Sequence, residues 1–294
     1  MFDATVTPTR SLRIAYLTEM HLQPERGAAD GVRACFRQVY ALTDAPDLIL
    51  NGGDLIMDAS AEDWARANLQ FDLWEAIAGE FDRIPVFHCL GNHDIWGWHR
   101  KSGCTGDEPL FGKGLAMARL KMEHPYYRLD RGTWRFLVLG SISRGGNDDF
   151  EARLDPGQFE WLRQELRDTP SDRHIVIVSH APLLGGGCLF FSGTPGEREK
   201  TGHWIIPGSW LHTDARTIHD LLVRHPSVRL CLSGHTHLYE QLTYNGITYI
   251  NGGSVSGRWW RGAYHRTSPG FGLLDLFSNG SFHFQYVPTA PEET

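Results

Sequence analysis

The sequence predicts an α/β fold, and two observations support this prediction. Short, nearly continuous apolar runs recur along the chain, as expected of strands that are buried on both faces of a sheet. Segments with a helical spacing of apolar residues lie between several of these runs, and such alternation is typical of layered α/β architectures. Neither a linker nor an internal repeat interrupts the pattern, so we expect a single domain over residues 1–294.

The apolar runs are the predicted strands. In chain order they cover residues 12–18, 47–51, 85–89, 134–140, 174–179, 228–233 and 247–251. Two further runs, 270–277 and 281–287, flank Ser278-Asn279-Gly280. An Asn-Gly pair between two such runs predicts a closing hairpin.

Helices are predicted where a start signal precedes apolar residues at helical spacing. Residues 31–42 form the first of them. Ser60 and Asp63 stand in a capping-box arrangement that opens a helix ending at about residue 78. Asp155 and Pro156 open another helix, and residues 213–225 form the last. Two long segments remain, 97–130 and 185–210, and we expect both to be cap or pocket elements because long loops in a compact domain are usually functional or disordered.

The composition argues against several classes of protein. The formal net charge of −7 opposes general nucleic-acid binding, because an acidic surface repels the phosphate backbone. The five cysteines include no CxxC spacing, so we expect reduced thiols and no disulfide framework. No apolar run approaches the ~20 residues that span a bilayer. No signal peptide is evident either, and we expect a cytoplasmic protein with no membrane partner.

Polar side chains of only a few types follow the predicted strands. They are Glu19 and His21 in LTEMHL, Asp54 in NGGD, Asn92, His93 and Asp94 in GNHD, His180 in SH, and His235 and His237 in GHTH. Each group stands just past the carboxyl end of an apolar run, the edge of an open α/β sheet where ligands bind. If the strand end is extended, Glu19 and His21 point the same way, because side chains two residues apart do so.

These side chains supply carboxylates, imidazoles and one amide, but no thiolate. Such nitrogen and oxygen ligands suit Mn, Fe or Zn ions rather than an iron–sulfur cluster. They are too numerous for one four-coordinate zinc ion, whereas two ions roughly 3.5–4 Å apart would use all of them with one carboxylate bridging. The sequence therefore predicts a dinuclear metal site.

The ordered series E-x-H, G-G-D, G-N-H-D, S-H and G-H-T-H resembles the calcineurin-like metallophosphoesterase superfamily. Each motif alone is weak, but the whole series, with each member after an apolar run, is a specific signal. The resemblance covers residues from about 12 to 237. It implies a four-layer αββα sandwich with two mixed β-sheets and the dinuclear site at the carboxyl ends of the strands. GNHD and GHTH are most similar to the branch that contains cyclic-nucleotide and glycerophosphodiester phosphodiesterases.

The resemblance also implies a role for each matching residue. Metal one would be held by Glu19, His21, Asp54 and His237, and metal two by Asp54, Asn92, His180 and His235. His93 would act on the leaving group, and Asp94 would orient His93. The implied activity is hydrolysis of a small-molecule phosphoric ester, with a preference for a diester, by attack of a metal-bound hydroxide on phosphorus.

The first motif departs from the family pattern, which is usually Asp-x-His, because Glu19 stands at its first position. Glutamate reaches about 1.5 Å further than aspartate. Glu19 therefore ligates metal one directly, ligates it through water, or marks a site that has decayed. We favour direct ligation because every other motif is intact. We also expect the extra length to loosen metal one, so that Glu19→Asp would tighten the site or leave it unchanged.

Two other functions stay open. One is a phosphomonoesterase of the same fold, and the other is a non-catalytic binding scaffold with a weakened metal site. Glu19 is the feature that favours a scaffold, and the intact His93 opposes it. Asp58 either supports the site or caps a loop. The candidates for substrate binding are His203, Arg258, Trp259 and Trp260, of which the RWWR residues could clamp a phosphate and stack on a substrate group.

Overall fold

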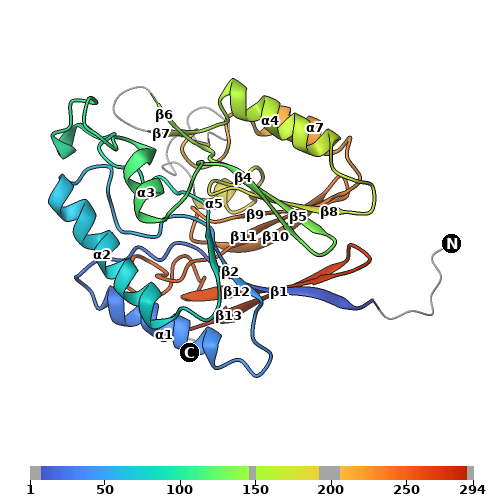
Figure 1. Cartoon of the computed structure of the whole chain (residues 1–294), viewed down its shortest axis with the longest axis horizontal. Helices are drawn as coiled ribbons and strands as arrows, with labels where there is room; N and C mark the ends of the chain where they lie inside the picture. Colours follow the sequence, from blue (N-terminus) through green and yellow to red (C-terminus); the bar gives the residue numbers. More distant parts are fainter. Residues whose placement is uncertain (1–7, 146–149, 192–205, 290–294) are drawn as a thin grey trace.

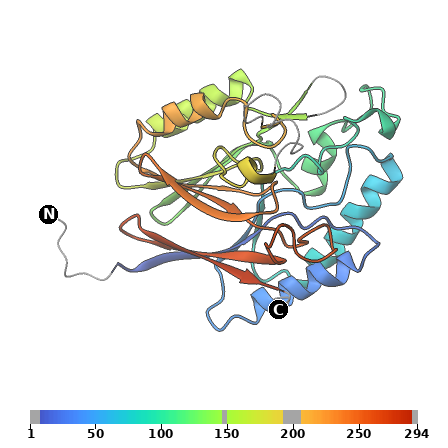
Figure 2. The ribbon, with the colours of Figure 1, turned by 180° about the vertical axis from the view of Figure 1, so that it is seen from behind.

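The computed structural model describes residues 8–145, 150–191 and 206–289. In these ranges two mixed β-sheets pack face to face, with helices on both outer sides (Figures 1 and 2). The first sheet has the strand order β13-β12-β1-β2-β3. Its strands are β1 (Arg10–Leu17), β2 (Leu48–Asn51), β3 (Val86–His88), β12 (Gly270–Phe277) and β13 (Phe282–Pro288). The pairs β1–β2 and β2–β3 are parallel, whereas β1–β12 and β12–β13 are antiparallel.

The second sheet has the order β10-β11-β9-β8-β5-β4. Its strands are β4 (Tyr127–Arg131), β5 (Trp134–Val138), β8 (His174–Val178), β9 (Val228–Ser233), β10 (Tyr239–Tyr244) and β11 (Ile247–Gly252). The four central strands run parallel, and each edge strand pairs antiparallel with its neighbour. A small separate ladder joins β6 (Ile142–Arg144) to β7 (Phe150–Ala152).

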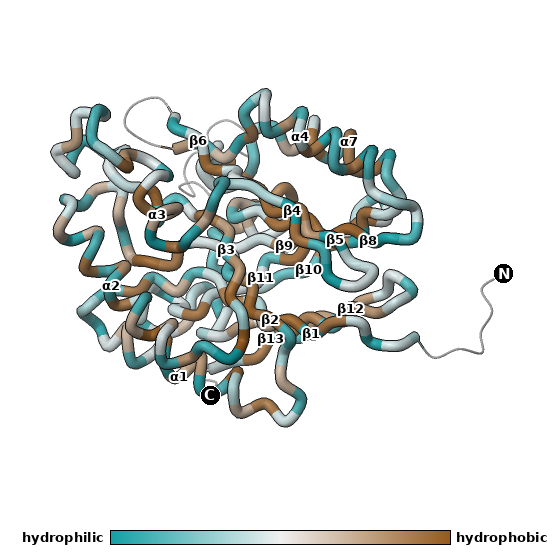
Figure 3. The backbone as a smooth tube through the Cα atoms, in the orientation of Figure 1, coloured by the Kyte–Doolittle hydropathy of each residue, from teal (hydrophilic) through white to brown (hydrophobic). Residues whose placement is uncertain are grey.

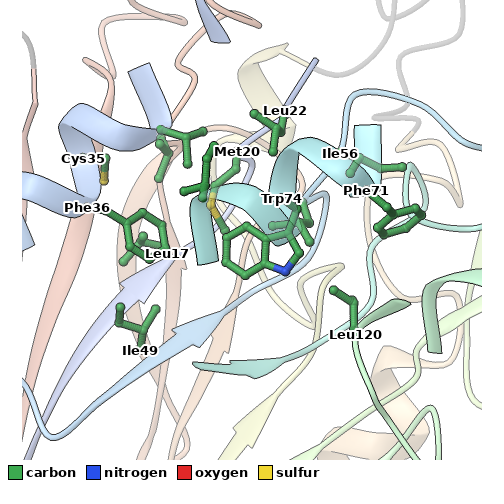
Figure 4. Packing of buried hydrophobic residues seen from close by; sticks show 14 of the residues in the cluster. Leu17, Met20, Leu22, Cys35, Phe36, Ile49, Ile56, Phe71, Trp74 and Leu120 are labelled. Carbon is green, nitrogen blue, oxygen red and sulfur yellow. The ribbon is translucent and has the colours of Figure 1, made fainter. Parts of the chain in front are cut away.

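Apolar clusters fill the spaces between four layers. Alternate residues of β1 serve both faces of its sheet, as the two-residue period of a strand requires. Ile14 and Tyr16 join β5, β8 and β9 residues in the core between the two sheets. Ala15 and Leu17 face helices α1 (Ala28–Tyr40) and α2 (Trp64–Glu80), where rings from both helices pack closely (Figure 4).

The outer face of the second sheet is covered by α4 (Pro156–Arg167) and α7 (Ala215–Leu222), whose buried residues pack on β5 and β8. Figure 3 shows the apolar residues concentrated along the strands, while the helices carry apolar and polar residues in turn. The expected four-layer αββα architecture with two mixed sheets is therefore confirmed. None of the helices in the described ranges combines the length and apolar character needed to cross a membrane.

Several predicted boundaries need correction. The N-cap of α2 is Asp63, whose side chain accepts a hydrogen bond from the Arg66 amide, and not Ser60. At α4 the prediction is confirmed, since Asp155 caps the helix and Pro156 occupies its first turn. The closing hairpin of β12 and β13 is also confirmed. Strands β4 and β10 were not predicted, because as edge strands they are only partly buried and carry no continuous apolar run.

The segment 97–130 contains regular structure, namely the 3₁₀ turn η1 (Arg100–Ser102), helix α3 (Lys113–Arg119) and the first part of β4. Of the segment 185–210, the structure describes residues 185–191, which include helix α5 (Cys188–Phe191), and residues 206–210.

Candidate metal centre

The predicted ligands follow the carboxyl ends of five strands from both sheets. Glu19 and His21 follow β1, Asp54 follows β2, Asn92 and His93 follow β3, His180 follows β8, and His235 and His237 follow β9. Their side-chain atoms meet in three overlapping groups, in each of which the ligand atoms lie within 4.8 Å of one another. The groups are Glu19–His21–His237, His21–Asp54–His93 and Asp54–His180–His235.

The backbone is left-handed at five of these residues. Strand β1 ends at Leu17, and φ is +58° at Glu19 and +44° at His21. Asp54, His235 and His237 also have positive φ values, of +52°, +68° and +59°. Left-handed backbone is uncommon outside glycine and persists where the surrounding structure enforces it, often at functional sites. Sharp local turns, rather than strand alternation, therefore bring Glu19 and His21 together.

The first cluster gathers Glu19, His21 and His237. The Nε2 atoms of the two histidines are 3.0 Å apart, and Glu19 Oε2 lies 3.3 Å from the first and 3.2 Å from the second. Glu19 Oε1 accepts hydrogen bonds from Thr18 Oγ1 and from the His235 amide. Glu19 Oε2, in contrast, is buried and has no hydrogen-bond donor in good geometry among the described residues. A buried carboxylate oxygen without a donor, facing two imidazole nitrogens, is the arrangement that a metal ion completes.

The second cluster is centred on Nε2 of His180. This atom lies 3.1 Å from Asn92 Oδ1, 3.2 Å from His235 Nδ1 and 3.4 Å from Asp54 Oδ2. Asp54 Oδ2 is also 3.9 Å from Nε2 of His21 in the first cluster. The two clusters therefore share one carboxylate, and the residues present fit two ions with Asp54 between them.

Hydrogen bonds on the outer sides of the rings fix which nitrogen faces inward. His180 Nδ1 is 3.0 Å from the Gly52 carbonyl, His235 Nε2 is 2.5 Å from the Ser209 carbonyl, and His237 Nδ1 bonds to the Gly257 carbonyl. A carbonyl oxygen only accepts, so each of these outer nitrogens carries a proton. The inner nitrogen of each ring is then the one that can bind a metal, as in the histidine ligands of metalloproteins.

The charges within the site favour cations. Burial lowers the pKa of both His21 and His235 to about 4, which keeps these imidazoles neutral. Burial also disfavours a charge on His180, but Asp54 and Glu19 outweigh it and raise its pKa to about 10. Burial alone would raise the pKa of Glu19, yet the histidines around it, His180 above all, hold it well below the usual value. Burial likewise opposes ionisation of Asp54, but His180 and His93 hold its pKa below the usual value. Glu19 and Asp54 thus remain ionised and attract positive charge.

Asp94 has a different position from the one expected. We expected it to orient His93, but none of the hydrogen bonds that the described residues make with His93 involves Asp94. Its Oδ2 accepts from the amides of Asp54 and Gly91 at 3.0 and 2.8 Å, and its Oδ1 from those of Leu55 and Ile56 at 2.9 and 3.2 Å. The fully buried Asp94 therefore shapes the backbone that carries Asp54, the carboxylate between the two clusters.

Asp94→Asn is expected to destabilise the metal-free protein by about 2–6 kcal/mol. Whichever oxygen becomes the amide nitrogen, two buried backbone donors lose their acceptor, and each such loss costs roughly 1–3 kcal/mol. Urea unfolding of the apo protein measures the change. The matched control is Asp63→Asn at the cap of α2, where asparagine is an equally good cap and the change should stay within about 0.5 kcal/mol. Equal stability of Asp94→Asn and the parent would show that these four bonds contribute little.

His93 lies beside the shared carboxylate and is reachable from solvent. Its Nε2 is 4.0 Å from Asp54 Oδ2, its amide donates to Asp54 Oδ1 at 2.9 Å, and its side chain is 27% exposed. It lines a cavity of about 220 Å³ that borders both clusters. The other lining residues are Asp54, Trp210, His235, Thr236, His237, Trp259 and Tyr264.

The four candidates for substrate binding lie in different places relative to the cavity. Trp259 lines the cavity, with its ring centroid 4.6 Å from that of His237. Trp260 does not line it, and its indole instead donates to the carbonyls of Met20 and His21. Arg258 is exposed and is not among the lining residues. His203 lies outside the described residues.

Sequence reasoning missed several residues of the cavity and its support. Trp210 and Tyr264 supply rings to the cavity but belong to no motif. Trp210 does lie at the end of the segment 185–210, whereas no lining residue comes from 97–130. Asp58 caps a loop, since its Oδ1 accepts from the Ala61 amide at 3.1 Å.

A buried relay of hydrogen bonds holds the segment that carries Trp210. Asp214 Oδ1 is 2.9 Å from His212 Nδ1, and His212 Nε2 is 2.9 Å from Ser179 Oγ, next to the ligand His180. The same segment supplies the Ser209 carbonyl that bonds to His235. Ser179 is only 3% exposed, so this serine–histidine–aspartate chain supports the site and is out of reach of a substrate.

Glu19→Asp is expected to weaken metal one by about tenfold or more, which reverses the expectation from the sequence. The two carboxylate oxygens of Glu19 have different partners. Oε1 accepts a hydrogen bond from the His235 amide, while Oε2 faces His21 and His237. An aspartate is about 1.5 Å shorter and cannot do both, and disturbed support of a metal site costs about 10–100-fold in affinity. Calorimetric titration of metal into apo protein measures the loss.

The control for this substitution is Glu25→Asp, a surface residue paired with Arg66, which should leave both affinities unchanged. Tighter binding of metal one in Glu19→Asp would show that the length of glutamate is a handicap after all.

Comparison with known proteins agrees with this geometry. The sequence profile of calcineurin-like phosphoesterases matches residues 12–239. A 3′,5′-cyclic-nucleotide phosphodiesterase of a Nostoc species is 23% identical over 282 residues, which cover 92% of this chain and 90% of that protein. The 3′,5′-cyclic adenosine monophosphate phosphodiesterase CpdA of Escherichia coli K12 is 25% identical over 286 residues, 92% of this chain and 87% of CpdA.

Among solved structures, a dimetal phosphatase from Danio rerio has the same fold, with a TM-score of 0.65 at 14% identity over 96% of this chain and 98% of that one. The family match spans most of the chain, and the buried ligand clusters lie within the matched residues. The protein therefore belongs to the calcineurin-like phosphoesterase family.

Proposed function

We propose that the protein hydrolyses phosphodiesters, and among them 3′,5′-cyclic nucleotides, at a site that holds two metal ions. The observation that carries the proposal is the pair of buried ligand clusters that share Asp54 beside a cavity containing His93. The chain keeps every ligand motif in a buried, converging arrangement, which a scaffold without catalytic activity does not require.

Glu19, His21 and His237 with Asp54 would hold metal one, and Asp54, Asn92, His180 and His235 would hold metal two. The nitrogen and oxygen donor set suits Mn, Fe or Zn. When bound, such ions neutralise charge on a phosphoryl oxygen and lower the pKa of a coordinated water.

His93 is the proposed general acid. In the cleavage of a cyclic nucleotide, water adds to phosphorus and the bond from phosphorus to one ribose oxygen breaks, so that this oxygen needs a proton. His93 lies in the cavity wall within reach of such an oxygen, and Asp54 fixes its backbone through the His93 amide. A positioned side chain of this kind typically contributes about 10²–10⁴-fold to the rate.

The cavity lining favours a diester over a monoester. A diester carries one negative charge near neutral pH, whereas a monoester approaches two. Within the described part of the chain, the lining residues include no lysine or arginine that would balance the second charge. They do include Trp210, Trp259 and Tyr264, whose rings give a nucleobase flat surfaces to stack on.

The relatives support the same choice, because the Nostoc and Escherichia coli proteins carry the names of cyclic-nucleotide phosphodiesterases.

The test is a panel of substrates assayed with Mn²⁺, Zn²⁺, Fe²⁺ and Mg²⁺. It contains 3′,5′-cyclic AMP and GMP, bis(p-nitrophenyl) phosphate, glycerophosphodiesters and p-nitrophenyl phosphate. We expect the highest kcat/KM with cyclic nucleotides. Preference for the monoester would replace the proposal with a phosphomonoesterase, and binding of two ions without hydrolysis of any member would favour a scaffold.

A further inference from the structure

The segment Ser254–Trp260, which we call the metal-one clamp, follows β11 and lies outside the region that the family profile matches. Its sequence, SVSGRWW, contains two tryptophans, of which Trp259 faces the cavity. Four other residues of the clamp bond to the backbone of the first ligand motif, namely Ser254, Val255, Ser256 and Trp260.

The clamp bonds to four consecutive carbonyls of that motif. The Val255 amide donates to Thr18 at 3.0 Å, and the Ser256 amide donates to Glu19 at 3.1 Å, where Ser254 Oγ donates as well at 3.3 Å. The Trp260 indole N–H is shared between the carbonyls of Met20 and His21, at 3.1 Å each. These bonds cover the stretch in which Glu19 and His21 have positive φ.

The clamp also orients the third ligand of the cluster. The Gly257 carbonyl accepts the hydrogen bond from His237 Nδ1, and this bond turns Nε2 toward Glu19 and His21. All three residues of the first cluster are thus held by one short segment.

The second cluster is supported from elsewhere. His180 bonds to the Gly52 carbonyl, and His235 bonds to the Ser209 carbonyl. Within the described residues, no hydrogen bond joins the clamp to either of these rings. The clamp therefore acts on one of the two proposed ions.

We propose that Trp260 is a positioning residue for metal one. Its indole fixes the Met20 and His21 carbonyls and so holds the strained backbone that aims Glu19 and His21 at the ion. This inference rests on the proposed two-metal site. It gives the tryptophan a role in metal affinity, distinct from the substrate contact proposed for its neighbour Trp259.

Helix α1 packs against the Trp260 ring at Gly31 and so fixes the position of the ring. A Cβ atom added at Gly31 would lie 2.1 Å from Cζ3 of Trp260, closer than any side chain tolerates. Alanine at an interior helix position normally favours the helix over glycine. At Gly31 the same change must displace the indole. A substitution on the outer helix should therefore lower the affinity for metal one.

The experiment measures Zn²⁺ binding by calorimetry in apo protein, separately for each ion. A His180→Ala background retains the ligands of the first cluster, and a Glu19→Ala background retains those of the second. Trp260→Phe keeps a ring but loses the N–H. We expect it to weaken Zn²⁺ about tenfold in the His180→Ala background, the usual effect of removing outer support of a ligand, and less than about twofold in the Glu19→Ala background.

Gly31→Ala is the second variant and should also weaken only metal one. Its matched control is Gly79→Ala in α2, where an added Cβ meets nothing within 4 Å and the affinity should not change. Combined with Trp260→Phe, which removes the part of the ring that would clash, Gly31→Ala should have a smaller effect than alone.

Parent-like Zn²⁺ affinity in Trp260→Phe, or equal weakening of both ions, would overturn the role of Trp260 while leaving the two-metal site intact. Failure of the parent protein to bind two ions would overturn the proposed function, and the clamp with it.

Discussion

Asp54→Asn is expected to remove both metal ions and, with them, hydrolysis of every substrate. Asp54 Oδ2 lies between the two clusters, 3.4 Å from His180 Nε2 and 3.9 Å from His21 Nε2. The amide of asparagine keeps the size of the side chain but carries no negative charge, and hard or borderline cations bind neutral amides less strongly than carboxylates. Loss of the shared ligand therefore weakens two ions, whereas loss of any other ligand affects mainly one.

Metal analysis of the purified variant and a parallel assay with bis(p-nitrophenyl) phosphate test this expectation. The matched control is Asp58→Asn, four residues along in the same loop, where the carboxylate only caps the Ala61 amide. That variant should keep both ions and full activity. An Asp54→Asn protein that retains two ions would show that Asp54 does not bridge them.

The fold was predictable because its central strands are buried on both faces. β2, β8, β9 and β11 appear in the sequence as apolar runs, and the helices between them carry capping signals such as Asp155-Pro156. The edge strand β10 alternates between exposed and half-buried residues, so its sequence carries no strong pattern. Its place in the sheet depends on pairing with β11, which no local signal specifies.

That the candidate ligands come together was predictable from residue type and order, but their local geometry was not. Glu19 and His21 come together through left-handed turns that tertiary hydrogen bonds enforce, whereas strand alternation would have been the local expectation. The role of Asp94 could not be predicted for a similar reason. Its carboxylate oxygens accept hydrogen bonds from the amides of Asp54 and Leu55, about 40 residues away in the sequence. The motifs indicate which side chains come together, and the structure shows which hydrogen bonds hold them in place.

The supporting residues of the site carried the weakest sequence signal. Trp260 and Tyr264 lie beyond the last family motif, and Trp210 lies in a segment without periodicity. RWWR suggested a substrate clamp, yet one tryptophan faces the cavity while the other bonds to the ligand backbone. The two adjacent tryptophans thus have different roles, and both have left-handed backbone, at φ of +47° and +65°.

His93→Ala is expected to retain both ions while kcat for a cyclic nucleotide falls by roughly 10²–10⁴-fold, the share that a positioned general acid supplies. Metal should stay because the His93 ring is not among the proposed ligands, lies 4.0 Å from Asp54 Oδ2 and is partly exposed. The ribose oxygen that leaves from a cyclic nucleotide is strongly basic and needs a proton as the bond to phosphorus breaks. A nitrophenolate leaves as a stable anion, so the loss with bis(p-nitrophenyl) phosphate should be much smaller.

The comparison of leaving groups is therefore the decisive measurement. His124→Ala, an exposed histidine far along the chain from the ligand motifs, is the control and should leave both rates unchanged. If His93→Ala lost metal, its effect on kcat would reflect the ions rather than a proton, so metal content is measured on the same sample. An equal fall in kcat for the two kinds of leaving group would exclude His93 as the acid and assign it to stabilising charge on the phosphoryl group. A fall confined to the basic leaving group would place the proton on His93 at the moment the ester bond breaks.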